Sequence, residues 1–144
     1  MLVDHILDRK GRDVATVAPT TTVTEALRAL QAHNVGALVV TTDGRQVEGI
    51  VSERDIVRGL AEHGADLLTR PVGDIMITDV QTCCGTDTAD ELMHRMTEHR
   101  IRHLPVVGDA GLAGIISIGD VVKTRVDELE REQSHLVDYI RSPY

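Results

Sequence analysis

The sequence GIVSERDIV at residues 49–57 returns later in the chain as GIISIGDVV at residues 114–122. Aligned without gaps, the two stretches share five residues of nine. The shared pairs are Gly49/Gly114, Ile50/Ile115, Ser52/Ser117, Asp55/Asp120 and Val57/Val122. Each copy therefore places an aspartate three residues after a serine, at the end of a short apolar run.

The repeat extends over most of the chain. Residues 14–40 align with residues 80–106, and eight of the 27 aligned positions are identical. Unrelated sequences of average composition match at about one position in fifteen, so the chain contains an internal duplication. We expect repeat 1 at residues 1–66, repeat 2 at residues 67–125 and a helical extension at residues 126–144.

Each repeat carries a helix start signal at the same place. Thr22-x-x-Glu25 and Thr88-x-x-Glu91 have the pattern of a capping box, in which the hydroxyl and the carboxylate satisfy backbone N–H groups at the first turn. Apolar residues follow both boxes at helical spacing. The two boxes therefore predict one helix in each repeat.

Short apolar runs after these helices predict paired strands. VGALVVT at 35–41 and IRHLPVV at 101–107 are typical of buried strands, and turn residues separate each from a second strand, VEGIVS or LAGIIS. Pro105 has no N–H for a sheet ladder, so we expect it at a strand edge or start. The fold class is α/β (α+β), with two pseudo-symmetric β-α-β-β-α repeats packed as one unit.

Composition argues against nucleic acid as a partner. The chain has 144 residues and a formal net charge of −8, whereas phosphate backbones are bound by clusters of Lys and Arg. It has no Phe and no Trp, and its two tyrosines, Tyr139 and Tyr144, stand at the end. A bound aromatic ring would therefore be held by aliphatic side chains and backbone.

No stretch of the sequence has the character of a membrane span or a signal peptide. The apolar runs are only four or five residues long, and acidic residues interrupt the N-terminal run MLVDHIL. We therefore expect no membrane partner and, by default, a cytoplasmic location.

The doubled pattern resembles the cystathionine β-synthase (CBS) domain, which occurs in tandem pairs called Bateman modules. The likeness rests on the β-α-β-β-α repeat, on a buried strand such as HLPVV and on the closing Gly-h-h-Ser-x-x-Asp-h-h, where h is an apolar residue. It covers about residues 3–130. The resemblance implies two pseudo-symmetric halves with clefts between them that bind AMP, ADP, ATP, NAD or S-adenosylmethionine.

Chemistry gives the Ser-x-x-Asp pattern two interpretations. An aspartate at a helix start can accept hydrogen bonds from the hydroxyls of a ribose, while the helix N-terminus attracts phosphate. Ser52 and Ser117 could donate to that phosphate. The same pattern is also a capping box variant that needs no ligand.

The resemblance assigns residues to two clefts. In one, Ser52 and Asp55 would hold ribose and phosphate, and adenine would be held by Thr78, Val80 and the strand start Ile101, Arg102, His103 and Leu104. In the other, Ser117 and Asp120 would act with Val14 and the strand start Val35, Gly36, Ala37 and Leu38. Arg102 and His103 are expected to favour phosphate beside Asp120, and Arg54 to supply the charge beside Asp55.

The two cysteines are adjacent and are interpreted as structural. Cys83 and Cys84 cannot form a disulfide framework or a CxxC metal motif, and their apolar surroundings offer nothing that stabilises a thiolate. His99 and His103 are close enough in sequence to suggest zinc. Their four-residue spacing suits a continuous helix, however, and a strand is expected to begin between them.

The C-terminal segment predicts a long helix with a heptad pattern. Apolar residues and one glutamine recur at alternating spacings of four and three: Val122, Val126, Leu129, Gln133, Leu136 and Ile140. This helix could fold back on its own domain or pair with a second chain. We expect pairing, because a glutamine in such a row fixes the register between helices.

The first functional hypothesis is a regulatory module, not an enzyme, that senses an adenine nucleotide and passes the ligand state to an unidentified partner. No cofactor is expected as a catalyst. The second is a ligand-free dimerisation scaffold in which both aspartates only cap helices. The third is a redox enzyme that uses the two cysteines.

Overall fold

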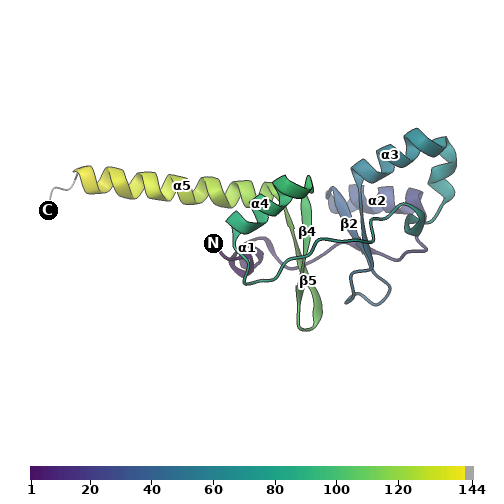
Figure 1. Ribbon diagram of the computed structural model, residues 1–144, viewed down its shortest axis with the longest axis horizontal. Coiled ribbons are helices and arrows are strands. Elements are labelled where there is room, and N and C mark those ends of the chain that lie inside the picture. The colour runs from purple at the N-terminus through teal and green to yellow at the C-terminus, as the bar shows by residue number, and fades with distance from the viewer. Residues whose placement is uncertain (142–144) are drawn as a thin grey trace.

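The computed structural model describes residues 1–141, so residues 142–144 of the expected C-terminal extension lie outside the described residues. Two halves lie side by side, and one long helix projects from them (Figure 1). The first part of the chain forms α1 (Val3–Lys10), β1 (Thr16–Val17), α2 (Val23–His33), β2 (Ala37–Val40), β3 (Gly49–Ser52) and α3 (Glu53–His63). Two 3-10 helices, η1 (Gly64–Thr69) and η2 (Val72–Asp74), link it to the second part.

The second part repeats the helix, strand, strand, helix order. It consists of α4 (Ala89–His99), β4 (His103–Gly108), β5 (Gly111–Ser117) and α5 (Ile118–Arg141). The mixed α and β architecture expected from the duplication is confirmed. No helix within residues 1–141 has the length and apolar character needed to cross a membrane.

Both expected helix starts are present and have the expected chemistry. Thr22 and Thr88 are the N-caps of α2 and α4, and each accepts a hydrogen bond from the backbone of the glutamate three residues later. That glutamate, Glu25 or Glu91, in turn accepts from the backbone N–H of its threonine. The paired bonds satisfy N–H groups that a helix start leaves without partners.

The two sheets differ at one position, and Pro105 explains the difference. In the first half β1 runs parallel to β2, and the Val39 N–H donates to the Ala15 carbonyl at 3.2 Å. Pro105 is the residue aligned with Val39 and has no N–H to donate. The second half keeps only one parallel bridge, in which Val107 donates to Cys83 at 2.9 Å. The expected first strand of repeat 2 is therefore reduced to that bridge.

Each hydrophobic core contains residues from both sequence repeats. The first combines α2, β2, β3 and α3 with Leu67 and Val72 from the link. The second combines α4, β4, β5 and the start of α5 with Val3, Ile6 and Leu7 of the N-terminal helix. The segment before each repeat thus packs on the opposite half, and Figure 1 shows α1 beside β4, β5 and α4.

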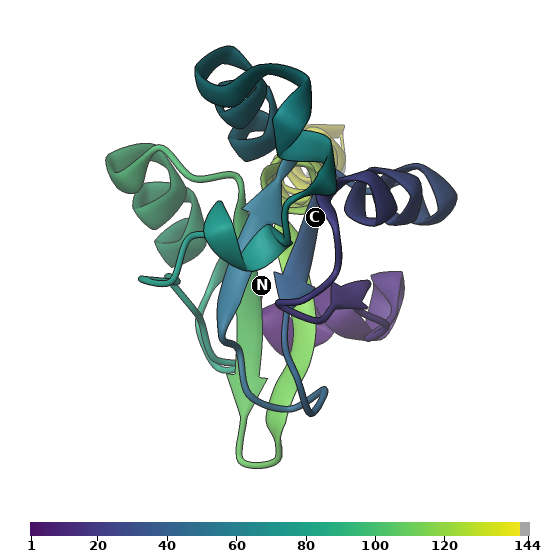
Figure 2. The ribbon, with the colours of Figure 1, turned by 90° about the vertical axis from the view of Figure 1, so that its right-hand side faces the viewer.

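The repeated glycine at the start of GIVS and GIIS leaves room for these crossing segments. A Cβ atom at Gly49 would lie 2.6 Å from the Met76 sulfur, and one at Gly114 would lie 2.7 Å from a Leu7 methyl carbon. Both distances are shorter than carbon contacts allow. In Figure 2 the strands of both halves run through the middle of the molecule, with the helices around them.

Candidate functional site

The repeated nonapeptides end a strand and begin a helix in both halves. Ser52 is the N-cap of α3, and Oδ2 of Asp55 accepts hydrogen bonds from the Ser52 backbone N–H at 2.8 Å and from its hydroxyl at 2.9 Å. Ser117 and Asp120 repeat this arrangement at the start of α5 with the same two distances. Both pairs are therefore complete capping boxes, and both serine hydroxyls already donate to a carboxylate.

A cavity of about 360 Å³ lies where the two halves meet. Its lining comes from the start of β2, the β3–α3 junction, Ile77, the α4–β4 junction and the first residue of α5. The two strand starts approach closely, since a Cβ atom at Gly36 would be 3.5 Å from the His103 ring. The volume falls in the range of small-molecule sites, which is about 300 to 1,000 Å³.

Positive charge is concentrated in this cavity, although the chain as a whole is acidic. Its lining includes four arginines, Arg54, Arg58, Arg100 and Arg102, and two carboxylates, Glu53 and Asp55. Within residues 1–141, none of these six side chains takes part in an ion pair within 4 Å. The second carboxylate oxygen of Asp55 also accepts no hydrogen bond from the described residues. The cavity therefore offers cationic donors together with a free carboxylate oxygen.

Four isoleucines supply the apolar part of the cavity: Ile50, Ile77, Ile101 and Ile118. Ile77 and Ile118 are unusually exposed for their size, at 43% and 39%. A flat apolar group in the cavity would cover them and remove apolar surface from water.

Asp120 has a different environment from Asp55. Lys10, in the last turn of α1, donates from Nζ to Oδ2 of Asp120 at 2.7 Å and to the Ile115 carbonyl at 2.9 Å. Burial alone would raise the pKa of Asp120, but the bonds from Lys10 and Ser117 outweigh it and lower the pKa. The depression beside Asp120 measures about 120 Å³ and is lined by α1 and α5. It is too small for a nucleotide.

The structure brings half of the sequence-predicted site residues into the larger cavity. These eight are Gly36, Ala37, Ser52, Arg54, Asp55, Ile101, Arg102 and His103. They come from both predicted clefts, and Arg102 and His103 lie with Asp55 rather than in the depression of Asp120. Burial, and then the charge of Lys10, lower the pKa of His103, which favours the neutral ring.

The other eight predicted residues do not line this cavity. Leu38 and Leu104 are fully buried in the two cores. Val35 packs against the first core, Val14 and Val80 are half-buried, and Thr78 is exposed beside the lining residue Ile77. Ser117 and Asp120 form the cap of α5 described above.

Sequence reasoning missed six lining residues, of which Arg58 and Arg100 bear most on ligand chemistry. Arg58 lies one helical turn after Arg54 on α3, so the i, i+4 spacing could have identified it. Arg100 follows α4 with a φ of 55°, and its aligned residue Asn34 has a φ of 53°. Asparagine tolerates this left-handed conformation better than arginine does. The other four missed residues are Ile50, Glu53, Ile77 and Ile118.

The cysteines lie away from this cavity. Cys83 is buried, and burial raises the pKa of its thiol to about 12. Cys84 is exposed. No group of three or more His, Cys, Asp or Glu side chains that could hold a metal occurs in the part of the chain that the structure describes.

Two curated relatives of the chain are named for the CBS domain. CBS domain-containing protein CBSX3, mitochondrial, of Arabidopsis thaliana is 41% identical over 127 residues, which are 85% of this chain and 62% of that protein. The chain thus spans less than two thirds of that relative. CBS domain-containing protein YhcV of Bacillus subtilis (strain 168) is 32% identical over 132 residues, with 92% and 91% covered. Because one relative is named mitochondrial, the cytoplasmic location stays a prediction.

Solved structures and the family profile agree with these relatives. The CBS-domain containing protein ATU1752 from Agrobacterium tumefaciens superposes with a TM-score of 0.84 at 49% identity, covering 87% of this chain and 99% of that one. CBS domain protein PAE2072 from Pyrobaculum aerophilum, complexed with AMP, gives 0.74 at 29% identity, covering 83% and 89%. The profile described as CBS domain matches residues 5–62 and 72–127. The chain therefore belongs to the CBS domain family and carries two copies of this domain.

Proposed function

We propose that this protein is a regulatory module that binds an adenine nucleotide in the cavity between its halves and passes the ligand state to a partner protein. The observation that carries the proposal is the free carboxylate oxygen of Asp55 in a cavity that also holds four arginines. A ribose hydroxyl can donate to that oxygen, while the arginines neutralise the phosphate. The AMP complex of the related PAE2072 protein is consistent with this ligand class.

The adenine ring is assigned to the isoleucine side of the cavity. Ile50, Ile77, Ile101 and Ile118 provide aliphatic surface, and the backbone at Gly36 and Ala37 provides polar groups for the ring edge. Among the described residues, no Phe, Tyr or Trp side chain lines the cavity. Binding therefore buries apolar area mainly against aliphatic side chains.

The charge of the lining favours phosphate-bearing members of the ligand class. AMP, ADP, ATP and NAD carry negative charge, whereas the sulfonium of S-adenosylmethionine is positive and would face the arginines. Arg54 and Arg102 come from different halves. An anion between them draws the two halves together, and Ile118 at the start of α5 would carry that change toward the projecting helix.

The ligand-free scaffold remains the second candidate, because both Ser-Asp pairs are complete capping boxes. The redox alternative has less support, since the buried Cys83 thiol resists ionisation.

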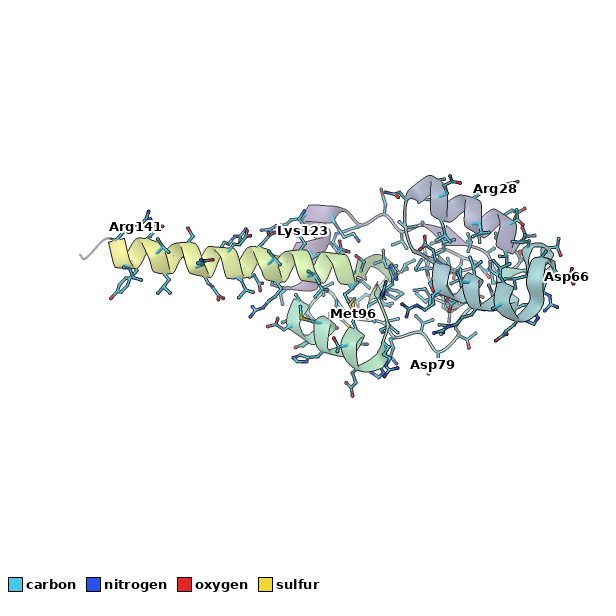
Figure 3. All side chains as sticks on the ribbon, turned by 90° about the horizontal axis from the view of Figure 1, so that it is seen from above. Arg28, Asp66, Asp79, Met96, Lys123 and Arg141 are labelled. Carbon is cyan, nitrogen blue, oxygen red and sulfur yellow. The ribbon has the colours of Figure 1, made fainter. Side chains whose placement is uncertain are left out.

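Calorimetry on nucleotide-free protein tests the proposal. We expect AMP to bind, adenosine to bind more weakly, and S-adenosylmethionine to bind least. Arg102→Ala should lower AMP affinity about tenfold, since a charge-assisted hydrogen bond contributes about 1.5–3 kcal/mol, and should change adenosine affinity little. Arg28→Ala is the matched control, because Arg28 is an exposed arginine that does not line the cavity. Figure 3 labels it on α2. Absence of AMP binding to the parent would leave the scaffold as the function.

A further inference from the structure

The long helix α5 carries an apolar row that its own domain leaves uncovered. The seam consists of Val122, Val126, Leu129, Gln133, Leu136 and Ile140. Its apolar members are 45% to 70% exposed along the whole length of the helix. In Figures 1 and 3, α5 leaves the body after its first turns and continues alone to Arg141.

The domain uses a different face of α5 for its own packing. Val121 and Thr124 are the buried residues of the helix, and Glu128 on the same side holds the N-terminal ammonium group at 2.8 Å. Successive helical residues are turned by about 100°, so Val121 and the seam residue Val122 point in clearly different directions. The seam therefore cannot fold back on the body while Val121, Thr124 and Glu128 hold their side of α5 against it.

We propose that the seam pairs with the seam of a second copy of this chain, as a parallel two-stranded coiled coil in register. The spacing of four, three, four, three and four is the heptad spacing of a and d positions. From Val122 to Ile140 it extends for about 27 Å. Pairing covers the apolar side chains, and the two domains lie on opposite outer sides of the coil.

Charge selects the parallel arrangement. Arg125 and Glu130 stand at g and e positions five residues apart, so in a parallel pair each Arg125 faces Glu130 of the second copy. Arg125 has long contacts of its own, at 3.3 Å to Glu128 and 3.9 Å to Asp90, and its five donors allow a further partner. An antiparallel pair with full seam overlap would instead place Glu130 against Glu130 and Glu132 against Glu132.

Gln133 supports the same arrangement. It stands at an a position near the middle of the exposed part of α5, where a parallel pair places the two glutamines side by side. Each amide can donate to and accept from the other, which offsets the cost of burying them and penalises shifted registers.

The rest of α5 argues against a lipid surface as the occupant. Between residues 118 and 141 the helix has four Lys or Arg residues and six Asp or Glu residues. Helices that lie on anionic membranes have a basic polar face.

The first experiment measures the mass of the full chain by light scattering over a concentration series. We expect a dimer, and a dissociation constant about a hundredfold higher for the double variant Leu129→Glu with Leu136→Glu, which buries charge in the seam. Ser134→Glu with His135→Glu is the matched control, because it adds the same charge on the exposed outer face and should dimerise like the parent. A monomeric parent, or a seam variant as dimeric as the parent, would overturn the proposal. Binding of a monomeric parent to phosphatidylglycerol vesicles would also overturn it and assign the seam to lipid.

The second experiment tests orientation with Ile140→Cys in a Cys84→Ser background, which removes the exposed native thiol. In a parallel pair the two new thiols are adjacent, so mild oxidation should give a covalent dimer. In the antiparallel pair residue 140 of each copy lies beside residue 122 of the other, about 27 Å from its counterpart. The Cys84→Ser parent should not cross-link. A dimer that yields no cross-link in the Ile140→Cys protein would overturn the parallel arrangement.

Discussion

The two halves hold their serine and aspartate in the same capping geometry but give the two aspartates different neighbours. In the first half Asp55 lines a cavity of about 360 Å³ and makes no ion pair with the described residues. In the second half Lys10 donates to Asp120 at 2.7 Å. No lysine within residues 1–141 lines the larger cavity beside Asp55. A duplicated motif can therefore keep its helix cap in both copies while, among the described residues, only one copy borders a cavity of small-molecule size.

The largest expected difference between the halves is in nucleotide affinity. Asp55→Asn keeps an oxygen for the helix cap but replaces the free carboxylate oxygen with an amide, so AMP affinity should fall by about tenfold or more. Asp120→Asn should change AMP affinity by less than about threefold, because Asp120 is paired with Lys10 and borders a depression of only about 120 Å³. Calorimetry with AMP on both variants makes the measurement. Equal losses would show that the two sites are equivalent in solution.

A smaller difference is expected from the aligned pair Asn34 and Arg100. Both are left-handed, with φ of 53° and 55°, and only Arg100 lines the cavity. Arg100→Asn should relieve backbone strain and raise stability by up to about 1 kcal/mol. It should also lower AMP affinity about threefold to fivefold, a modest effect because Arg100 is exposed and solvent screens its charge.

Asn34→Arg is the reciprocal control for Arg100. It should lower stability by up to about 1 kcal/mol and leave AMP affinity unchanged, because Asn34 does not line the cavity. Urea unfolding and calorimetry on the two variants separate the effects. An Arg100→Asn protein that binds AMP like the parent would mean that the guanidinium has no role in binding.

Local sequence signals predicted the elements of the fold well. The Thr-x-x-Glu pairs mark the starts of α2 and α4, and the repeated Ser-x-x-Asp marks the starts of α3 and α5. These signals work because a cap uses residues only three positions apart.

Contacts between distant residues could not be predicted in the same way. The bond from Lys10 to Asp120 joins residues 110 positions apart and depends on α1 packing against the second half. Packing between the halves also explains why residues predicted for two separate clefts line one cavity. Arg102 and Asp55 come from different repeats, and only the packing of one half on the other decides that they share a cavity. The face that α5 turns to its own domain likewise depends on its contact with α4.

The contact between Lys10 and Asp120 gives a prediction for acid stability. The folded pKa of Asp120 lies below its unfolded value, which is about 3.9 for aspartate. Its contribution is therefore complete above that value and is lost as the pH falls through the folded pKa. Lys10→Met should destabilise the protein by about 0.5–1 kcal/mol at pH 7, since the pair is partly exposed. The deficit should shrink as the pH falls below about 4.

Urea unfolding of the parent and variant at pH 7 and near pH 3 measures this change. Lys123→Met is the control, because Lys123 lines the same small depression and makes no ion pair within residues 1–141. It should leave the pH dependence of the parent unchanged. A Lys10→Met deficit that is the same at both pH values would separate the stabilising role of Lys10 from the charge of Asp120.

The smallest expected effect comes from Pro105, which accounts for the different sheets of the two halves. Pro105→Val restores an N–H opposite the Gln81 carbonyl, in the place where Val39 donates to Ala15. The new bond should contribute about 0.5–1.5 kcal/mol. Loss of the rigid ring gives the unfolded chain more freedom and costs about 0.4–1 kcal/mol. Net stability should therefore change by less than about 1 kcal/mol.

Hydrogen exchange provides the sharper measurement, because the new amide at position 105 should be protected like that of Val39. The Val107 amide, which donates to Cys83 already, should be equally protected in both proteins. A fast-exchanging amide at position 105 would mean that the second sheet is shortened by something other than the proline.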